Sequence, residues 1–135
     1  MPNLKHRFTY KFLGDDTFSR PYIPVSLKHG EKSLPILALL DSGADYCMFD
    51  AELTSILGLD LIKMEKTKMT GVGGEAECFV TRLPVCIEDT CITVPVLFSS
   101  DFSPNGFGGV IGQIGFFDRF IISFDRAKKD ILLKQ

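Results

Sequence analysis

Leu34-Pro-Ile-Leu-Ala-Leu-Leu40, followed at once by Asp41-Ser42-Gly43-Ala44-Asp45, is the most informative stretch of the chain. The apolar run predicts a buried strand that ends on a carboxylate. Burying an unpaired ion costs several kcal/mol, so Asp41 must be hydrogen-bonded, protonated or used in chemistry. Ser42 is small and can hydrogen-bond its neighbours, and Gly43 lets the backbone turn tightly beneath the carboxylate. The pattern favours a functional role for Asp41.

Length and composition describe an ordinary globular protein. The 135 residues predict one domain, spanning 1–135, and 45% of them are hydrophobic, 24% charged, with a net charge of −2. The sequence contains no cluster of basic residues, so nucleic acid is not expected as a partner. No apolar stretch approaches the roughly 20 residues that span a bilayer. The start of the chain has no apolar segment typical of a secretory signal, so we expect a cytoplasmic protein without membrane contact.

The cysteines do not suggest a metal site. Their spacing matches no zinc pattern, so neither metal nor cofactor is expected. We favour buried, reduced thiols, with disulfides as the alternative. The four cysteines are Cys47, Cys78, Cys86 and Cys91.

Most of the chain has the alternation or short apolar runs typical of strands. The expected strands cover residues 7–13, 22–28, 33–40, 61–70, 75–87, 91–98, 109–112, 120–125 and 130–134. One short helix is expected over 50–58, with Asp50 as its N-cap and Gly58 as its C-terminal stop. A helical turn is expected over 113–118. The sequence therefore predicts a mainly β domain with one or two short helices.

Three landmarks, in this order, resemble the retropepsins, the single-domain aspartic proteases of retroviruses and their cellular and prokaryotic relatives. They are Leu39-Leu-Asp-Ser-Gly-Ala-Asp45, Thr70-Gly-Val-Gly-Gly74 and Val110-Ile-Gly112. The resemblance covers about residues 22–133. It implies a closed β-barrel, the acid-protease fold, and a homodimer in which one aspartate from each subunit meets its copy at the two-fold axis. The Asp-Ser-Gly motif occurs once in the chain, so one copy supplies half of such a site.

The resemblance implies that Asp41 is catalytic. One carboxylate would take a proton from water while the other, protonated, polarises the scissile carbonyl of a peptide or protein substrate. Two carboxylates about 3 Å apart repel by roughly 5 kcal/mol at an effective dielectric of about 20. This repulsion favours a pair that shares one proton. The plainer alternative is a solvated aspartate in a turn.

The neighbours of Asp41 also have implied roles. By resemblance, Ser42 braces the pair of aspartates and Asp45 binds the substrate main chain, although an Asx turn explains Asp45 nearly as well. Gly43 is expected to offer its carbonyl to the substrate.

The glycine-rich segment resembles the family's flap, a mobile hairpin that closes over the substrate. Val72, Gly73 and Gly74 are therefore expected to contact substrate, with an ordinary β-turn as the alternative. Aliphatic side chains, Ile111 and Val110 among them, are expected to wall pockets for apolar substrate residues.

Two departures from retroviral members stand out. Gln113 occupies a position that often holds an arginine bracing the dimer, so a weaker dimer is expected. The helix over 50–58 is familiar in cellular and bacterial members rather than in the smallest viral ones.

A different class of function also fits the fold: a non-catalytic module for dimerisation or peptide binding. A two-carboxylate site within one chain, using Asp118 or Asp125, is the weaker option because neither is followed by Ser/Thr-Gly.

Overall fold

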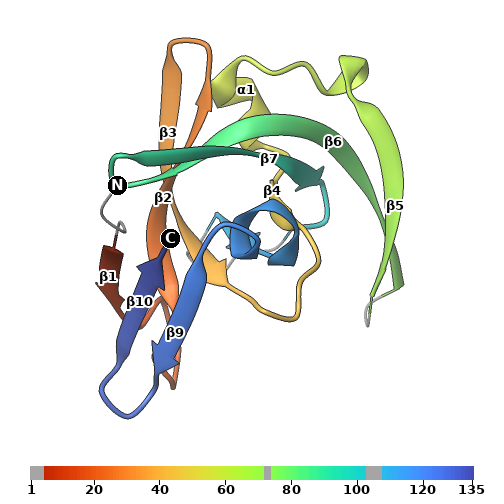
Figure 1. Cartoon of the computed structure of the whole chain (residues 1–135). Helices are drawn as coiled ribbons and strands as arrows, with labels where there is room; N and C mark the ends of the chain where they lie inside the picture. Colours follow the sequence, from red (N-terminus) through yellow and green to blue (C-terminus); the bar gives the residue numbers. More distant parts are fainter. Residues whose placement is uncertain (1–4, 72–73, 103–107) are drawn as a thin grey trace.

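The computed structural model describes residues 5–71, 74–102 and 108–135, and most of them lie in strands (Figure 1). In chain order the elements are β1 (Lys5–Thr9), β2 (Tyr22–His29), β3 (Lys32–Leu40), β4 (Cys47–Asp50), α1 (Leu53–Leu57), the 3₁₀ turn η1 (Leu61–Lys63), β5 (Glu65–Gly71), β6 (Gly74–Ile87), β7 (Thr90–Ser99), β8 (Gly109–Ile111), the kinked helical segment η2 (Gln113–Phe117), β9 (Ile121–Asp125) and β10 (Asp130–Lys134).

Six strands close into a barrel. Their order is β2-β3-β8-β4-β7-β6, and β6 pairs back onto β2 through Ser26 with Cys86 and Leu27 with Val85. β5 lies outside this ring and pairs with β6, so the β5–β6 hairpin extends away from the barrel in Figure 1. The expectation of a mainly β, closed-barrel fold with few helices is confirmed.

The barrel core follows the two-residue period of its strands. On β2, Ile23, Val25 and Leu27 are buried and point inward, and their neighbours Pro24 and Ser26 are more exposed. β6, which pairs with β2, buries Leu83 and Val85 on either side of the more exposed Pro84, and β7 buries Val94 and Val96 on either side of Pro95. Because successive side chains of a strand face opposite sides, this pattern holds each strand in one register. The resulting rigid barrel positions the end of β3, where Asp41 lies.

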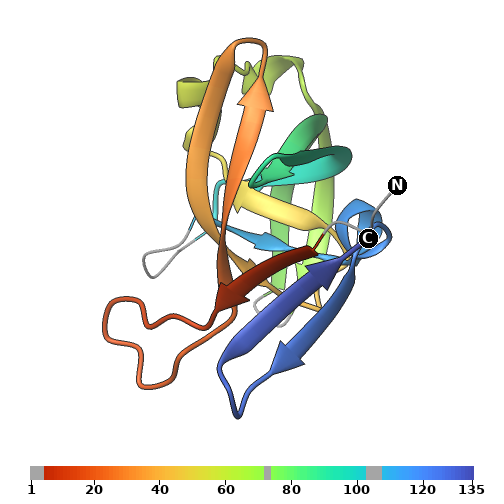
Figure 2. The same ribbon diagram turned by 60° about the vertical axis from the view of Figure 1, so that its left-hand side comes forward.

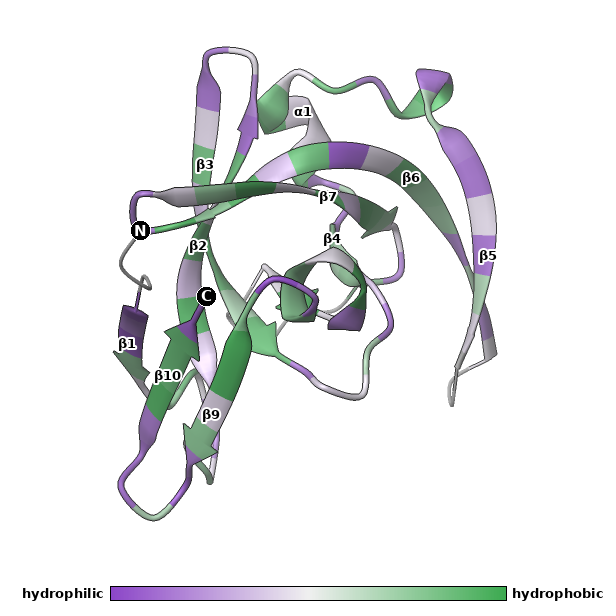
Figure 3. Cartoon of the chain, in the orientation of Figure 1, coloured by the Kyte–Doolittle hydropathy of each residue, from purple (hydrophilic) through white to green (hydrophobic). Residues whose placement is uncertain are grey.

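A second, smaller sheet joins the two ends of the chain. β1 pairs with β10, and β10 pairs with β9, all antiparallel (Figure 2). The expected first strand, over 7–13, is therefore shifted: it spans Lys5–Thr9 and adds to this sheet. Figure 3 shows hydrophobic residues along β9 and β10, whereas β5 is mainly hydrophilic. No helix in the described ranges is long and apolar enough to cross a membrane.

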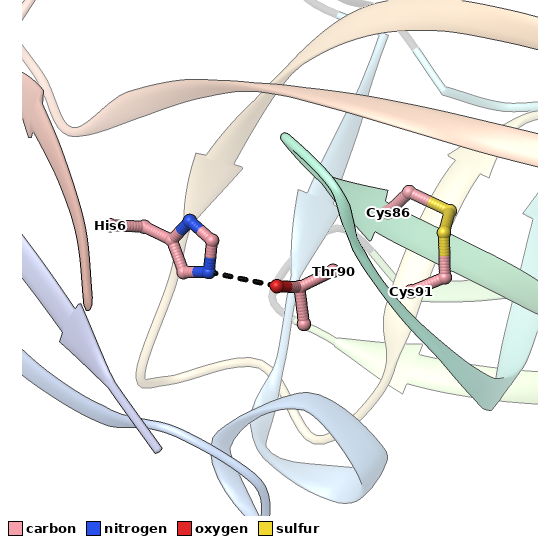
Figure 4. Close-up of a disulfide and its surroundings, with 4 residues drawn as sticks. All are labelled: His6, Cys86, Thr90 and Cys91. Atoms are coloured by element: carbon pink, nitrogen blue, oxygen red, sulfur yellow. Dashed lines mark hydrogen bonds between the residues drawn. A yellow bond between two sulfur atoms is a disulfide. The ribbon is translucent and has the colours of Figure 1, made fainter. Parts of the chain in front are cut away.

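The N-terminal strand is held to the tip of the β6–β7 hairpin by one buried histidine. His6 Nδ1 lies 2.6 Å from the Glu88 carboxylate, and His6 Nε2 lies 3.0 Å from the Thr90 hydroxyl, as Figure 4 shows for the second contact. Glu88 has a left-handed backbone, with φ of 51°. That conformation is uncommon for a residue with a side chain. The contact joins the small sheet to the barrel.

The expectation of four reduced cysteines is wrong for two of them. Cys86 and Cys91 form a disulfide next to the same hairpin tip (Figure 4). They are direct partners across β6 and β7, with Cα atoms 4.0 Å apart. The pairing follows from the two-residue turn at 88–89, which brings these positions opposite each other. Cys47 and Cys78 are free and buried, as expected.

Two further boundaries differ from the expected ones. The helix α1 begins at Leu53 rather than near Asp50, because residues 47–50 form β4, whose Asp50 carboxylate accepts a hydrogen bond from the Glu52 N–H. Gly58 ends α1 with φ of 73°, as expected. β5 begins at Glu65 and not near residue 61, because η1 occupies 61–63.

Candidate active site

Asp41 follows the last residue of β3 and remains hydrogen-bonded to β8. Its N–H donates to the Ile111 carbonyl at 2.9 Å, and its own carbonyl accepts from the Ala44 N–H at 3.1 Å. The half-buried carboxylate accepts a hydrogen bond from the Gly43 N–H through Oδ1, at 2.9 Å. Within the described ranges Oδ2 has no hydrogen-bond partner. The backbone thus orients one carboxylate oxygen and leaves the other available to a water or a second acid.

The loop from Asp41 to Asp45 is tied to the segment that follows β8. The Gln113 N–H donates to the Ala44 carbonyl at 2.9 Å, and the Ile114 N–H donates to the Asp45 carbonyl at 2.7 Å. The Gln113 side chain adds a third bond, from Nε2 to the Ser42 carbonyl at 2.7 Å. These bonds fix the backbone around Asp41 from a part of the chain about 70 residues away in sequence.

Gly112 permits this close crossing. A Cβ atom at Gly112 would lie 2.5 Å from the Tyr46 carbonyl oxygen and 2.7 Å from the Ala44 carbonyl oxygen. Its φ of −114° is open to any residue, so space and not backbone conformation requires glycine here. The apolar-apolar-glycine pattern at 110–112 therefore has a steric cause.

A cavity of about 550 Å³ lies between this loop and the β5–β6 hairpin. Such a volume falls within the range of about 300–1,000 Å³ that is usual for ligand sites. The loop, the hairpin and the inner ends of β4, β7 and β8 all contribute to its walls. The lining residues are Gly43, Ala44, Asp45, Tyr46, Met48, Met69, Thr70, Gly74, Glu75, Ala76, Leu97, Asp101 and Val110.

The predicted site residues fall into three groups. Gly43, Asp45 and Gly74 line the cavity. Asp41 and Ser42 are next to it in the same loop but do not line it, and the exposed Ser42 hydroxyl has no hydrogen-bond partner within the described ranges. Val72 and Gly73 lie outside the described residues.

Ile111 is the one candidate whose position argues against the predicted role. It is fully buried in the core, whereas Val110 lines the cavity. Successive residues of β8 face opposite sides, so only one of the two can wall the cavity. Of these two expected wall residues, Val110 therefore lines the cavity and Ile111 does not.

Several lining residues had no signal in the sequence. Met48 and Leu97 come from strands that meet only in the barrel, and Asp101 follows the end of β7. Met48 lies on a strand that was not expected. The sequence marked Gln113 only as a position where an arginine is common, yet its side-chain amide is hydrogen-bonded to the Ser42 carbonyl in the loop that follows β3.

Cys47 is the first residue of β4, and its buried thiol is in the unreactive, protonated form. Burial raises its pKa to about 11, although a hydrogen bond involving the Gly112 backbone opposes this shift. The thiol therefore stays protonated at neutral pH, and the thiolate is the reactive form of cysteine. A redox role for Cys47 gains no support from its surroundings.

No family model matches the sequence, and the comparison with curated proteins finds no match. Among solved structures, the chain is similar to a retropepsin-like aspartic protease from Rickettsia conorii, with a TM-score of 0.68 and 19% identity over 98% of this chain and 93% of the other. It is also similar to the EIAV protease in complex with an inhibitor, with a TM-score of 0.53 and 25% identity over 70% of this chain and 82% of the other. The chain therefore has a retropepsin-like fold.

Proposed function

We propose that the chain is an aspartic endopeptidase in which Asp41 of two identical subunits activates a water molecule for peptide hydrolysis. The observation that carries the proposal is the Asp41 carboxylate, oriented by the Gly43 N–H beside a cavity of about 550 Å³. The second oxygen of this carboxylate, Oδ2, has no hydrogen-bond partner within the described ranges. Two structural neighbours are aspartic proteases, which supports the same chemistry.

In the proposed reaction, the ionised Asp41 takes a proton from water as the water attacks the scissile carbonyl carbon. The protonated Asp41 of the second copy transfers its proton to the carbonyl oxygen, which gives a tetrahedral diol. When the carbon–nitrogen bond breaks, this second carboxylate takes back a proton from one hydroxyl group of the diol, and the proton first taken from water moves to the leaving nitrogen. The exposed Ser42 hydroxyl would stabilise the pair across the two-fold axis. The β5–β6 hairpin would close over the peptide and exclude bulk water.

Exposed apolar side chains on η2 and β9 support a dimer. Ile114, which hydrogen-bonds the loop, is 41% exposed, and Ile121 and Phe124 on β9 are 67% and 41% exposed. β9 is an edge strand, with no partner on its outer side in the described ranges. Exposed apolar edge strands are usually covered in a working protein. A second copy of the chain would cover these side chains and bring the two loops together.

Cleavage of a peptide library tests the proposal against the alternative of a non-catalytic peptide-binding module. The wild-type protein is expected to cut peptides, as detected by mass spectrometry, and pepstatin is expected to block the cutting because it mimics the hydrated transition state. Peptide binding without any turnover, over a range of pH, would favour the binding module.

Ile121→Asp is expected to weaken the dimer by at least about 100-fold, because an unpaired charge buried at an interface costs several kcal/mol. Sedimentation velocity over a concentration series measures the dissociation constant. Ile62→Asp is the matched control, since Ile62 is 90% exposed on η1, outside the proposed interface. Equal dissociation constants for the two variants would argue against β9 as the dimer surface.

A further inference from the structure

The peptide group between Ser42 and Gly43 is hydrogen-bonded at both of its ends. Its N–H, which belongs to Gly43, donates to Asp41 Oδ1 at 2.9 Å. Its carbonyl, which belongs to Ser42, accepts from Gln113 Nε2 at 2.7 Å. Because a peptide group is planar, a bond that holds the carbonyl also fixes the direction of the N–H on the other side. The Gln113 side chain is therefore connected to the Asp41 carboxylate through one rigid group.

The bond from Gln113 also affects the strength of the bond to Asp41. Hydrogen bonds in a chain polarise one another, so a carbonyl that accepts a bond makes the N–H of the same peptide group a better donor. The side-chain amide, the peptide group and the carboxylate form such a chain, and neither of its two bonds is longer than 2.9 Å. Gln113 thereby acts on the carboxylate through the peptide group.

The Gln113 side chain starts from an anchored backbone. The Gln113 N–H donates to the Ala44 carbonyl at 2.9 Å, and the Ile114 N–H donates to the Asp45 carbonyl at 2.7 Å. With these two bonds in place, few side-chain torsions remain to be fixed when Nε2 reaches the Ser42 carbonyl. All three bonds lie within one chain, so the arrangement does not depend on a second copy.

We propose that Gln113 is a positioning residue for the Asp41 carboxylate; the inference rests on the proposed function. By holding the Ser42 carbonyl, Gln113 keeps the Gly43 N–H on Oδ1, and Oδ2 then has one fixed position from which to take a proton from water. An amide suits this task, because it donates a hydrogen bond and carries no charge. The role concerns the chemical step, and it differs from that of the dimer-bracing arginine that retroviral members often carry at this position.

Gln113→Met removes the donor and keeps a long, unbranched and uncharged side chain. We expect kcat for peptide cleavage to fall about tenfold and KM to change by less than about twofold, because the variant displaces the reacting carboxylate and not the walls of the cavity. Initial rates over a range of substrate concentrations measure both constants. Gln113→Arg restores an N–H donor, so its kcat should return to within about threefold of the wild-type value. Gln135→Met is the matched control, since it makes the same exchange at the exposed last residue and should leave kcat unchanged.

The dependence of activity on protein concentration separates this role from dimer formation. A variant with a weakened dimer loses activity in dilute solution and recovers it when the protein is concentrated. Gln113→Met should instead show the same loss at every concentration, with a dimer dissociation constant within about twofold of the wild-type value by sedimentation velocity. Full recovery of activity at high concentration would overturn the inference and make Gln113 a dimer contact.

A second measurement does not depend on proteolysis. The amide proton resonance of Gly43 reports on its hydrogen bond to Asp41, and it should move upfield in Gln113→Met but not in Gln135→Met. An unchanged Gly43 resonance, or a wild-type kcat, in Gln113→Met would overturn the inference and leave the proposed function intact. Absence of cleavage by the wild-type protein would overturn the proposed function, and the Gly43 resonance would then still decide whether Gln113 holds this peptide group.

Discussion

Asp41→Asn is expected to lower kcat/KM for peptide hydrolysis by at least about 10³-fold, in line with the contribution of about 10²–10⁴ from general acid–base catalysis. In a homodimer the substitution removes both carboxylates at once. The asparagine oxygen can still accept the hydrogen bond that the Gly43 N–H donates to Oδ1. The loop should therefore keep its shape while losing the group that takes a proton from water.

The measurement is the initial rate of peptide cleavage, with thermal unfolding recorded in parallel. Asp89→Asn is the matched control, because Asp89 lies at the β6–β7 turn, far along the strands from the cavity, and should keep wild-type activity. Adding excess Asp41→Asn protein to the wild type should also suppress activity, since mixed dimers hold one carboxylate. Full activity of the Asp41→Asn protein would remove Asp41 from the mechanism.

Gly112→Ala is expected to lower the free energy of unfolding by about 3 kcal/mol, at the upper end of the cost of overpacking. The added Cβ would meet backbone atoms, the carbonyl oxygens of Tyr46 and Ala44, which cannot rotate away as a side chain would. Relief requires the loop to separate from β8, which breaks the bond from the Gln113 N–H to Ala44. We therefore expect activity to fall together with stability.

Urea unfolding monitored by circular dichroism measures this loss. Gly30→Ala separates steric overlap from backbone strain, because Gly30 has φ of 61° but nothing within 4 Å of an added Cβ. Its expected cost is about 1 kcal/mol, the penalty of a left-handed conformation. If Gly112→Ala were no more destabilising than Gly30→Ala, the crossing of the loop over Gly112 would not be as tight as described.

The parts of the fold that were predictable from sequence are those encoded by local patterns. The alternation in β2 and the apolar run of β3 indicated their hairpin, and Gly58 marked the end of α1. β4 was missed because its four residues are held between β7 and β8, from distant parts of the chain. Nothing local distinguishes such a short strand from a loop.

The site was predictable to the extent that one motif carries it. Asp41, Gly43 and Asp45 share a short loop, so the sequence alone brings them together. Asp101 and Glu75 reach the same cavity only through the β5–β6 hairpin and the end of β7. The Cys86–Cys91 disulfide was missed for a related reason, since the pairing depends on the length of the turn between two strands.

β5 is bonded to β6 alone and takes no part in the closed ring of strands. β6 pairs with β7 only from Cys78 onward, so a swing of the outer part of the hairpin, residues 68–71 and 74–77, leaves every inter-strand bond of the ring intact. The cost of admitting a peptide would then be separate from the cost of unfolding the domain. Amide hydrogens of residues 65–71 should exchange with solvent faster than those of β2, whose Ile23 and Leu27 lie in the core. In the proposed protease, entry and exit of a peptide chain could thus be frequent while the barrel stays closed.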